Sequence, residues 1–213
     1  MTAPNWPDFY FARHGETSWN RERRYQGSRD IPLNKTGQLQ ANANGVLLRD
    51  MLARDGVDPT QIQWFASPLS RAAETMDRMR AAFDVELPPV IHDKRLIEIS
   101  FGAFEGLLHD DVAKKFAAYA PGERDESYWE FRPENGENYD DVSARLLDFA
   151  NDVTLHAVVV AHGGVLRVLR HLIAGAGRAE VLNWPPPQGV IAHFAGGKME
   201  LFSAEDTWSA IDV

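Results

Sequence analysis

The chain has 213 residues, of which 44% are hydrophobic and 25% charged, and its formal net charge is −9. These values are ordinary for one large globular domain, and the acidic balance argues against a nucleic-acid partner, which would need a basic face. The sequence contains no cysteine, which excludes disulfides, thiolate chemistry and cysteine-based zinc sites. We expect a cytoplasmic protein with no membrane partner. A strand begins near Phe9, which leaves no room for a signal segment, and no apolar run approaches the roughly 20 residues that span a bilayer.

The first part of the chain predicts a strand, a long helix and a second strand. The strand is the apolar run 9–13, and the turn signal 34–37 precedes the helix. The apolar positions of this helix repeat at three- and four-residue spacing; they are Leu39, Ala43, Val46, Leu47 and Met51. The next strand is 62–66. Ser67 then suits an N-cap and Pro68 a first helical position, so a further helix is expected there.

The rest of the chain continues the alternation. Residues 90–92 predict a short strand, and 140–153 a helix whose apolar face holds Val142, Leu146, Leu147 and Ala150. The β-branched run 156–161 is typical of a strand buried on both faces. A helix over 164–174 follows, and then a hairpin of 190–194 and 198–202 around Ala195-Gly196-Gly197.

This order predicts a three-layer α/β/α fold with a mainly parallel central sheet. We expect one domain over residues 1–213. The stretch 96–138 is interpreted as a helical insertion over the carboxyl ends of the strands. Its aromatic residues either line a specificity pocket or form the core that fixes the insertion to the sheet; they are Phe101, Phe104, Phe116, Tyr119, Tyr128, Trp129 and Phe131.

Polar residues follow three of the predicted strands: Arg13-His14, Ser67 with Arg71, and His162. Ligands of open α/β sheets bind at the carboxyl ends of strands, so these residues predict one site. A neutral imidazole can act as a nucleophile, and the fork of arginine suits phosphoryl oxygens. The helix that starts at Gly163-Gly164 would offer backbone N–H groups to an anion. This set favours phosphoryl transfer.

Four blocks of the sequence, in order, resemble those of the histidine phosphatase superfamily, also called phosphoglycerate mutase-like. The blocks are Arg13-His14-Gly15-Glu16-Thr17 with Asn20, Ser67-Pro68-Leu69-Ser70-Arg71-Ala72-Ala73-Glu74-Thr75, 96–106, and Val160-Ala161-His162-Gly163-Gly164. The resemblance implies that His14 is the phosphorylated nucleophile and Glu98 the proton donor, with Glu105 as the rival donor. It also implies that the remaining site residues hold the phosphoryl group or substrate; they are Arg13, Asn20, Gln26, Gly27, Arg71, His162 and Gly163. No metal or organic cofactor is expected.

The resemblance covers both phosphatases and mutases. Family mutases carry a tyrosine where Phe101 stands, together with closely spaced basic groups in the insertion. Here the insertion has Lys114-Lys115, Arg124 and Arg132 but no adjacent arginine pair, and 133–138 is similar to a segment of the phosphatases. The sequence thus favours a phosphomonoesterase acting on a small phosphorylated metabolite. A phosphoglycerate mutase and a non-catalytic phosphate-binding module remain the alternatives.

Three further expectations concern the surroundings of this site and the assembly. A homodimer is possible. The arginines of the loop after the first strand, Arg21, Arg23, Arg24 and Arg29, either raise the potential near the pocket or are solvated. The histidines outside the four blocks are expected on the surface or in packing; they are His92, His109, His156, His171 and His193.

Overall fold

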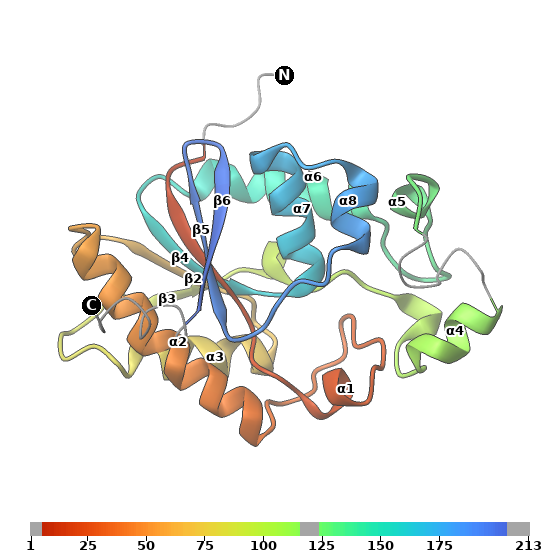
Figure 1. Cartoon of the computed structure of the whole chain (residues 1–213), viewed down its shortest axis with the longest axis horizontal. Coiled ribbons are helices and arrows are strands. Elements are labelled where there is room, and N and C mark those ends of the chain that lie inside the picture. Colours follow the sequence, from red (N-terminus) through yellow and green to blue (C-terminus); the bar gives the residue numbers. More distant parts are fainter. Residues whose placement is uncertain (1–5, 116–123, 204–213) are drawn as a thin grey trace, which may run out of the picture.

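A six-stranded sheet forms the centre of the computed structural model, which describes residues 6–115 and 124–203 (Figure 1). The strand order is β3-β2-β4-β1-β5-β6. The strands are β1 (Phe9–Arg13), β2 (Gln63–Ala66), β3 (Val90–His92), β4 (Ala157–Ala161), β5 (Val190–Ala195) and β6 (Lys198–Ser203). The first four run parallel, and β5 pairs antiparallel with both β1 and β6. The predicted fold class, a mainly parallel α/β sheet, is therefore confirmed.

The register of β1 and β4 decides where the polar residues emerge. Arg13 pairs with Ala161, so the next residue of each strand, His14 and His162, leaves the sheet at the same level. The backbone N–H of His14 donates to the carbonyl of Ala161 at 2.9 Å. On the other side of β4, the N–H of Ser67 donates to Val160 at 3.0 Å. Three strand ends thus meet at one edge of the sheet.

Helices cover both faces of the sheet, as side chains of alternating direction along β1 require. Tyr10 and Ala12 pack beneath α2 (Lys35–Arg54) and α3 (Ser70–Arg80). Phe9 and Phe11 face the opposite layer, which α6 (Tyr139–Phe149) and α7 (Gly163–Ala174) form. All five residues of β4 are buried, which explains its unbroken apolar sequence.

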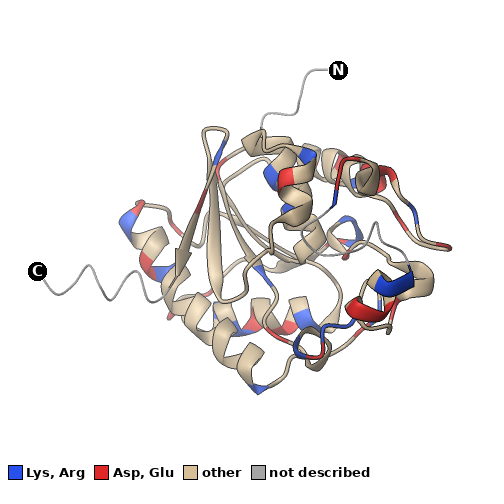
Figure 2. Cartoon of the chain, turned by 45° about the vertical axis from the view of Figure 1, so that its right-hand side comes forward, with Lys and Arg blue, Asp and Glu red and all other residues tan. Residues whose placement is uncertain are grey.

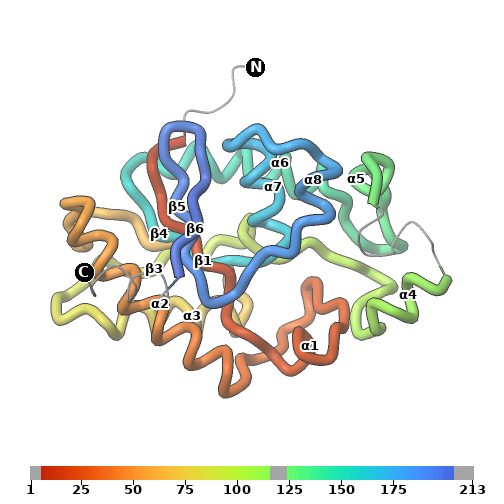
Figure 3. The backbone as a smooth tube through the Cα atoms, in the orientation of Figure 1, coloured from red at the N-terminus to blue at the C-terminus, as the bar shows by residue number. Residues whose placement is uncertain are grey.

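The predicted insertion lies beyond the carboxyl ends of the strands. Its described residues form a 3₁₀ turn (Gly102–Phe104) and two helices, α4 (His109–Lys115) and α5 (Ser127–Glu130). In Figure 1 these helices lie on the right-hand side, on the same side as α1 (Ser18–Arg21). The segment between α8 (Arg178–Asn183) and β5 runs beside the segment that follows β1, as the tube in Figure 3 shows. The site is therefore enclosed by chain from both ends of the sequence.

Several local predictions were wrong in detail. Leu39, Ala43 and Val46 of α2 are exposed, Leu39 by 69% and Val46 by 44%, because the helix turns Ala41, Leu48 and Leu52 to the sheet instead. Leu147 of α6 is also exposed, and that helix ends at Phe149 before a 3₁₀ turn. The short helices α1 and α8 were not predicted, since four and six residues are too few to show a helical period.

Charged residues are mixed in sign over the outer helices and are few on the strands (Figure 2). In the described part of the chain, no helix combines the length and the apolar character that crossing a bilayer would require.

The contact between α2 and α3 gives a test of the packing. A Cβ atom added at Gly45 would lie 2.6 Å from the carbonyl oxygen of Met79, which is backbone and cannot rotate away. We expect Gly45→Ala to lower the free energy of unfolding by about 2 kcal/mol, although alanine favours a helix by about 1 kcal/mol. Urea denaturation measures this change. At Gly177 nothing lies within 4 Å, so Gly177→Ala should change stability by less than about 0.5 kcal/mol. Equal effects at both positions would contradict the close contact.

Candidate active site

Two imidazoles face each other at the ends of β1 and β4. The ring centroids of His14 and His162 are 5.1 Å apart, and both side chains are buried. Nδ1 of His14 lies 2.7 Å from the carbonyl oxygen of Gly15. Because a carbonyl only accepts, Nδ1 carries the proton, and Nε2 of the neutral ring keeps its lone pair.

The surroundings of His14 keep that ring neutral. Burial lowers the pKa of His14 well below its usual value, and the positive charges of Arg71 and Arg13 lower it further. The same causes, burial first, act on the pKa of His162. A neutral, oriented imidazole is the form that can attack an electrophile.

The two arginines are held by backbone carbonyls. Arg13 donates to the carbonyl of Pro186 at 2.6 Å. Arg71 donates from its two terminal nitrogens to the carbonyls of Arg29 at 2.6 Å and Gly27 at 2.8 Å. Burial lowers the pKa of Arg13 to about 10, so this group remains a cation at neutral pH, and burial lowers the pKa of Arg71 as well. Neutral carbonyls orient the two guanidinium groups without cancelling their charge.

His162 corrects one prediction about the second block. Its Nε2 lies 2.8 Å from the hydroxyl of Ser67. Ser67 therefore does not cap a helix: α3 begins at Ser70 with Leu69 as its N-cap, and no side chain caps it. The serine instead fixes the ring of His162.

Three buried polar atoms beside His14 have no hydrogen-bond partner among the described residues. They are Nε of Arg13, Nε of Arg71 and Nδ1 of His162. Leaving a buried donor unpaired costs about 1–3 kcal/mol, so such groups are uncommon and ask for an explanation. An oxyanion offers several acceptors at once, so it is the kind of ligand that suits unpaired donors of this sort.

The two candidate proton donors lie in different places. Glu98 is 9% exposed and lines the cavity described below; its carboxylate accepts from the N–H of Gly164 at 2.9 Å. A Cβ atom at Gly164 would come within 2.5 Å of this carboxylate, so only glycine permits the approach. That N–H is therefore taken by Glu98, contrary to the expectation that it is free for an anion.

Glu105 is turned away from the cavity and binds a neighbouring loop. Its carboxylate accepts from the N–H and hydroxyl of Ser28 at 2.9 and 3.1 Å, and from the N–H of Phe101 at 3.2 Å. The loop it holds includes Gly27, whose carbonyl orients Arg71. Glu98 therefore faces the cavity, whereas Glu105 supports the loop that orients Arg71.

The polar residues after β1 form one hydrogen-bonded set. Oδ1 of Asn20 accepts from Thr17 at 3.1 Å and from Gln188 at 3.3 Å. Oε1 of the Gln26 side chain accepts from the hydroxyl of Thr17 at 2.9 Å. Gln188 also donates to the carbonyl of His14 at 2.9 Å, and sequence reasoning missed it. The proline run 185–187 just before it marks a rigid connection, which was the signal available.

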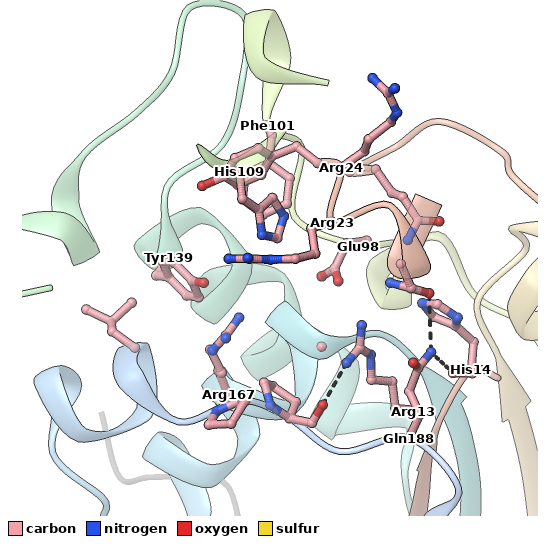
Figure 4. A pocket seen from close by; sticks show the side chains of 18 of the residues that line it. Arg13, His14, Arg23, Arg24, Glu98, Phe101, His109, Tyr139, Arg167 and Gln188 are labelled. Atoms are coloured by element: carbon pink, nitrogen blue, oxygen red, sulfur yellow. Dashed lines mark hydrogen bonds between the residues drawn. The ribbon is translucent and has the colours of Figure 1, made fainter. Parts of the chain in front are cut away.

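A cavity of about 520 Å³ opens above these residues (Figure 4). All the predicted site residues except His162 line it; they are Arg13, His14, Asn20, Gln26, Gly27, Arg71, Glu98 and Gly163. His162 is fully buried behind His14. The volume is many times that of a phosphate group, so the cavity has room for more of a ligand than its phosphoryl end.

The outer part of the cavity contains residues that the motifs did not indicate. Arg124, Arg167 and His109 belong to this wall. His109 also packs on the ring of Tyr25, with centroids 4.3 Å apart, which agrees with the packing role expected for it. Of the basic loop, Arg23 and Arg24 line the cavity, and Arg21 and Arg29 do not.

The insertion aromatics serve both of the predicted purposes. Phe101 and Tyr128 line the cavity, while Phe104 and Trp129 are buried in the core. Phe131 is 39% exposed. Phe116 and Tyr119 lie outside the described residues.

No group of three potential metal ligands comes together in residues 6–115 and 124–203. The donors of the site are instead guanidinium, imidazole and amide groups, which bind anions.

Comparisons with known proteins agree with this geometry. The profile of the histidine phosphatase superfamily (branch 1) matches residues 9–204. A 2,3-bisphosphoglycerate-dependent phosphoglycerate mutase 2 of Gloeobacter violaceus is 31% identical over 168 residues, which are 74% of this chain and 71% of that protein. A 2,3-bisphosphoglycerate-dependent phosphoglycerate mutase of Mesorhizobium japonicum is 29% identical over 84% of this chain and 86% of its own.

Solved structures of similar fold include proteins named as phosphatases. A candidate alpha-ribazole-5′-P phosphatase of Escherichia coli is 27% identical with a TM-score of 0.72, covering 93% of this chain and 96% of that one. The mycobacterial glucosyl-3-phosphoglycerate phosphatase, solved in complexes with VO3, is 25% identical with a TM-score of 0.69, covering 92% and 97%. The paired imidazoles at the strand ends and the match along almost the whole sequence lead to one conclusion: the chain belongs to the histidine phosphatase superfamily.

Proposed function

We propose that the protein hydrolyses a small phosphomonoester through a phosphohistidine intermediate on His14. One set of observations carries the proposal: Nε2 of His14 keeps its lone pair beside the ring of His162, and among the described residues the buried Nε atoms of Arg13 and Arg71 and Nδ1 of His162 have no hydrogen-bond partner. This is the arrangement that a phosphoryl group in transfer requires, with a nucleophile on one side and positive donors around its equatorial oxygens.

In the first step, Nε2 of His14 attacks phosphorus and the bond from phosphorus to the ester oxygen breaks. The guanidinium groups of Arg13 and Arg71 bind the equatorial oxygens. The carboxyl of Glu98 gives its proton to the departing alkoxide, so that an alcohol leaves. The carbonyl of Gly15 holds the Nδ1 proton, which stabilises the cationic ring that the attack produces.

In the second step, water takes the place of the departed alcohol. The carboxylate of Glu98 accepts a proton from this water while the oxygen of the water forms a bond to phosphorus. The bond from phosphorus to Nε2 breaks, inorganic phosphate leaves, and Glu98 is protonated again. Both the nucleophile and the acid are thereby restored.

A phosphoglycerate mutase is the second candidate, and two observations favour it. Similar proteins of Gloeobacter violaceus and Mesorhizobium japonicum are named as such mutases. The cavity also holds arginines beyond those at His14, which weakens the argument from the missing arginine pair. Against it stands Phe101, which lines the cavity without a hydroxyl group.

The alternative of a non-catalytic module requires that His14 and Glu98 do no chemistry. Hydrolysis, the homodimer and the cytoplasmic location stay predictions.

Replacing the nucleophile tests the intermediate. We expect His14→Ala to lower turnover of 4-nitrophenyl phosphate by at least about 10³-fold and to abolish acid-labile ³²P labelling of the protein. Rapid quenching with a labelled ester measures the second quantity. The matched control is His92→Ala, an exposed histidine on β3, which should keep both. Labelling that persists in His14→Ala would reject His14 as the nucleophile.

Replacing each glutamate tells the donor from the supporting residue. Glu98→Gln should slow an alkyl phosphate by about 10²–10⁴-fold in kcat/KM, because its leaving alkoxide needs a proton. It should slow 4-nitrophenyl phosphate far less and produce a burst of one nitrophenol per enzyme, since only the water step then lacks its base. Glu105→Gln should reduce both esters alike, because Arg71 binds the phosphoryl group of each. The reverse pattern would assign the proton to Glu105.

The products of one reaction separate hydrolase from mutase. With 3-phosphoglycerate and a trace of 2,3-bisphosphoglycerate, we expect release of inorganic phosphate to exceed formation of 2-phosphoglycerate. Phosphorus NMR follows both products in one sample. Isomer formation that outruns phosphate release would establish the mutase instead.

A further inference from the structure

We propose that Glu137 and Arg145 are positioning residues, which hold the segment 95–100, the acid segment, so that its Glu98 can protonate the leaving group. The inference rests on the proposed function, because it takes Glu98 as the proton donor. Neither Glu137 nor Arg145 lines the cavity, so both act on the reaction only through the residues that they bind.

The acid segment has little regular structure of its own. It begins in a 3₁₀ turn (Lys94–Leu96), and residues 97–101 belong to neither a helix nor a strand. Leu96 and Ile99 are buried, which attaches the segment to the core. Apolar packing is non-directional, however, and does not fix how the backbone is turned at Glu98. That orientation depends on hydrogen bonds to the segment.

Glu137 binds the acid segment at Ser100. Its carboxylate accepts from the N–H of Ser100 at 2.9 Å, and its own N–H donates to the carbonyl of Ser100 at 2.8 Å. Gly136 permits this approach, because a Cβ atom there would lie 2.8 Å from that carbonyl oxygen. Both backbone groups of Ser100, which follows Glu98 by two residues, are thus bound by one residue.

Arg145 binds the acid segment at its other end. One terminal nitrogen of this α6 residue donates to the carbonyl of Arg95, and its Nε donates to Glu137 at 3.2 Å. The side chains of Arg145 and Glu137 are only 17% and 28% exposed, so solvent screens their ion pair less than it screens a surface pair. A single guanidinium thus connects both ends of the segment, and Glu98 lies between the two fixed points.

The carboxylate of Glu98 lies where a small displacement would matter. Burial lowers the pKa of Arg13 and of Arg71, and the negative charge of Glu98 acts in the opposite direction on both, so this carboxylate is near the two guanidinium groups. Figure 4 shows Glu98 directed into the cavity. Misplacing a catalytic group by about 1 Å can lower a rate about 10²-fold. Only steps that need the proton would lose rate, so alkyl esters should be slowed more than activated aryl esters.

Loss of this ion pair should therefore separate the two classes of ester. We expect Arg145→Gln and Glu137→Ala each to lower kcat/KM by about 10- to 100-fold for the alkyl phosphate that the wild type hydrolyses fastest, and by less than about threefold for 4-nitrophenyl phosphate. Arg145→Lys keeps the charge but lacks the fork that reaches both partners, so the ratio of the two values should fall by at least about threefold in this conservative variant too. Arg170→Gln is the matched control and should keep both rates. Arg170 is 21% exposed, pairs with Glu180 and does not line the cavity.

A double substitution shows whether Arg145 acts through Glu98. In a Glu98→Gln background, adding Arg145→Gln should lower the alkyl rate by less than about twofold, because the group that Arg145 positions is already gone. Losses that multiply, or equal losses on both esters in the single variants, would show a general structural role and overturn the proposal. Hydrogen exchange of the acid segment gives a readout without turnover. It should be faster in Arg145→Gln than in Arg170→Gln, and equal exchange would show that the segment is held without Arg145.

The outcomes also separate this inference from the proposed function. If Glu98→Gln alone slows both esters alike, Glu98 is not the donor and the inference fails, although hydrolysis through His14 stands. If the wild type forms 2-phosphoglycerate from 3-phosphoglycerate and releases no phosphate, hydrolysis fails as the function. The double substitution, followed by isomer formation, then tests the inference, because the phosphoryl group there also leaves an alkyl oxygen that needs a proton.

Discussion

The site depends on the parallel pairing of β1 with β4 in a single register. Arg13 opposite Ala161 brings His14 and His162 out of the sheet together, with ring centroids 5.1 Å apart. A shift by one residue would turn one imidazole to the opposite face of the sheet and bury it among the helices. A slipped pairing would also have to repack both faces of the sheet, because every residue of β4 and residues Phe9 to Ala12 of β1 are buried. Apolar packing therefore determines the geometry of the polar residues.

That geometry gathers two buried guanidinium groups, which among the described residues feel the negative charge of Glu98 but form no direct ion pair. Arg13 and Arg71 are oriented by backbone carbonyls, which hold a guanidinium but leave its charge intact. In the part of the chain that the structure describes, Nε of each arginine has no acceptor. The cost of burying these charged groups is offset by apolar packing, in two clusters that lie on opposite faces of the sheet. Donors that are already oriented bind an anion more tightly than mobile ones would, because little reorganisation is needed when the anion arrives.

The sequence predicted strands and motif residues well, because each signal is local. Alternation along 9–13 and the apolar run before His162 are properties of neighbouring residues, and both strands lie where expected. The errors concern partners distant in sequence. Ser67 looks like a helix cap until His162 is placed beside it, and Gln188 has no motif yet it bonds to the carbonyl of His14. The buried face of α2 was misjudged because Leu39 and Val46 fit the helical period but lie on the solvent side.

The same limitation affected the argument against a mutase. A search for adjacent arginines presumes that an anion site is built from one segment, whereas Arg23, Arg124 and Arg167 come from a loop, the insertion and α7. The number of arginines therefore does not separate hydrolysis from the mutase reaction, since either reaction can use a doubly charged substrate. The distinction rests on access of water to phosphohistidine. Glu98 lies on the open wall of a large cavity, so water that enters after the alcohol leaves meets a base beside the phosphoryl group. The proposed hydrolysis therefore depends on water reaching Glu98, a requirement that is independent of the charge of the substrate.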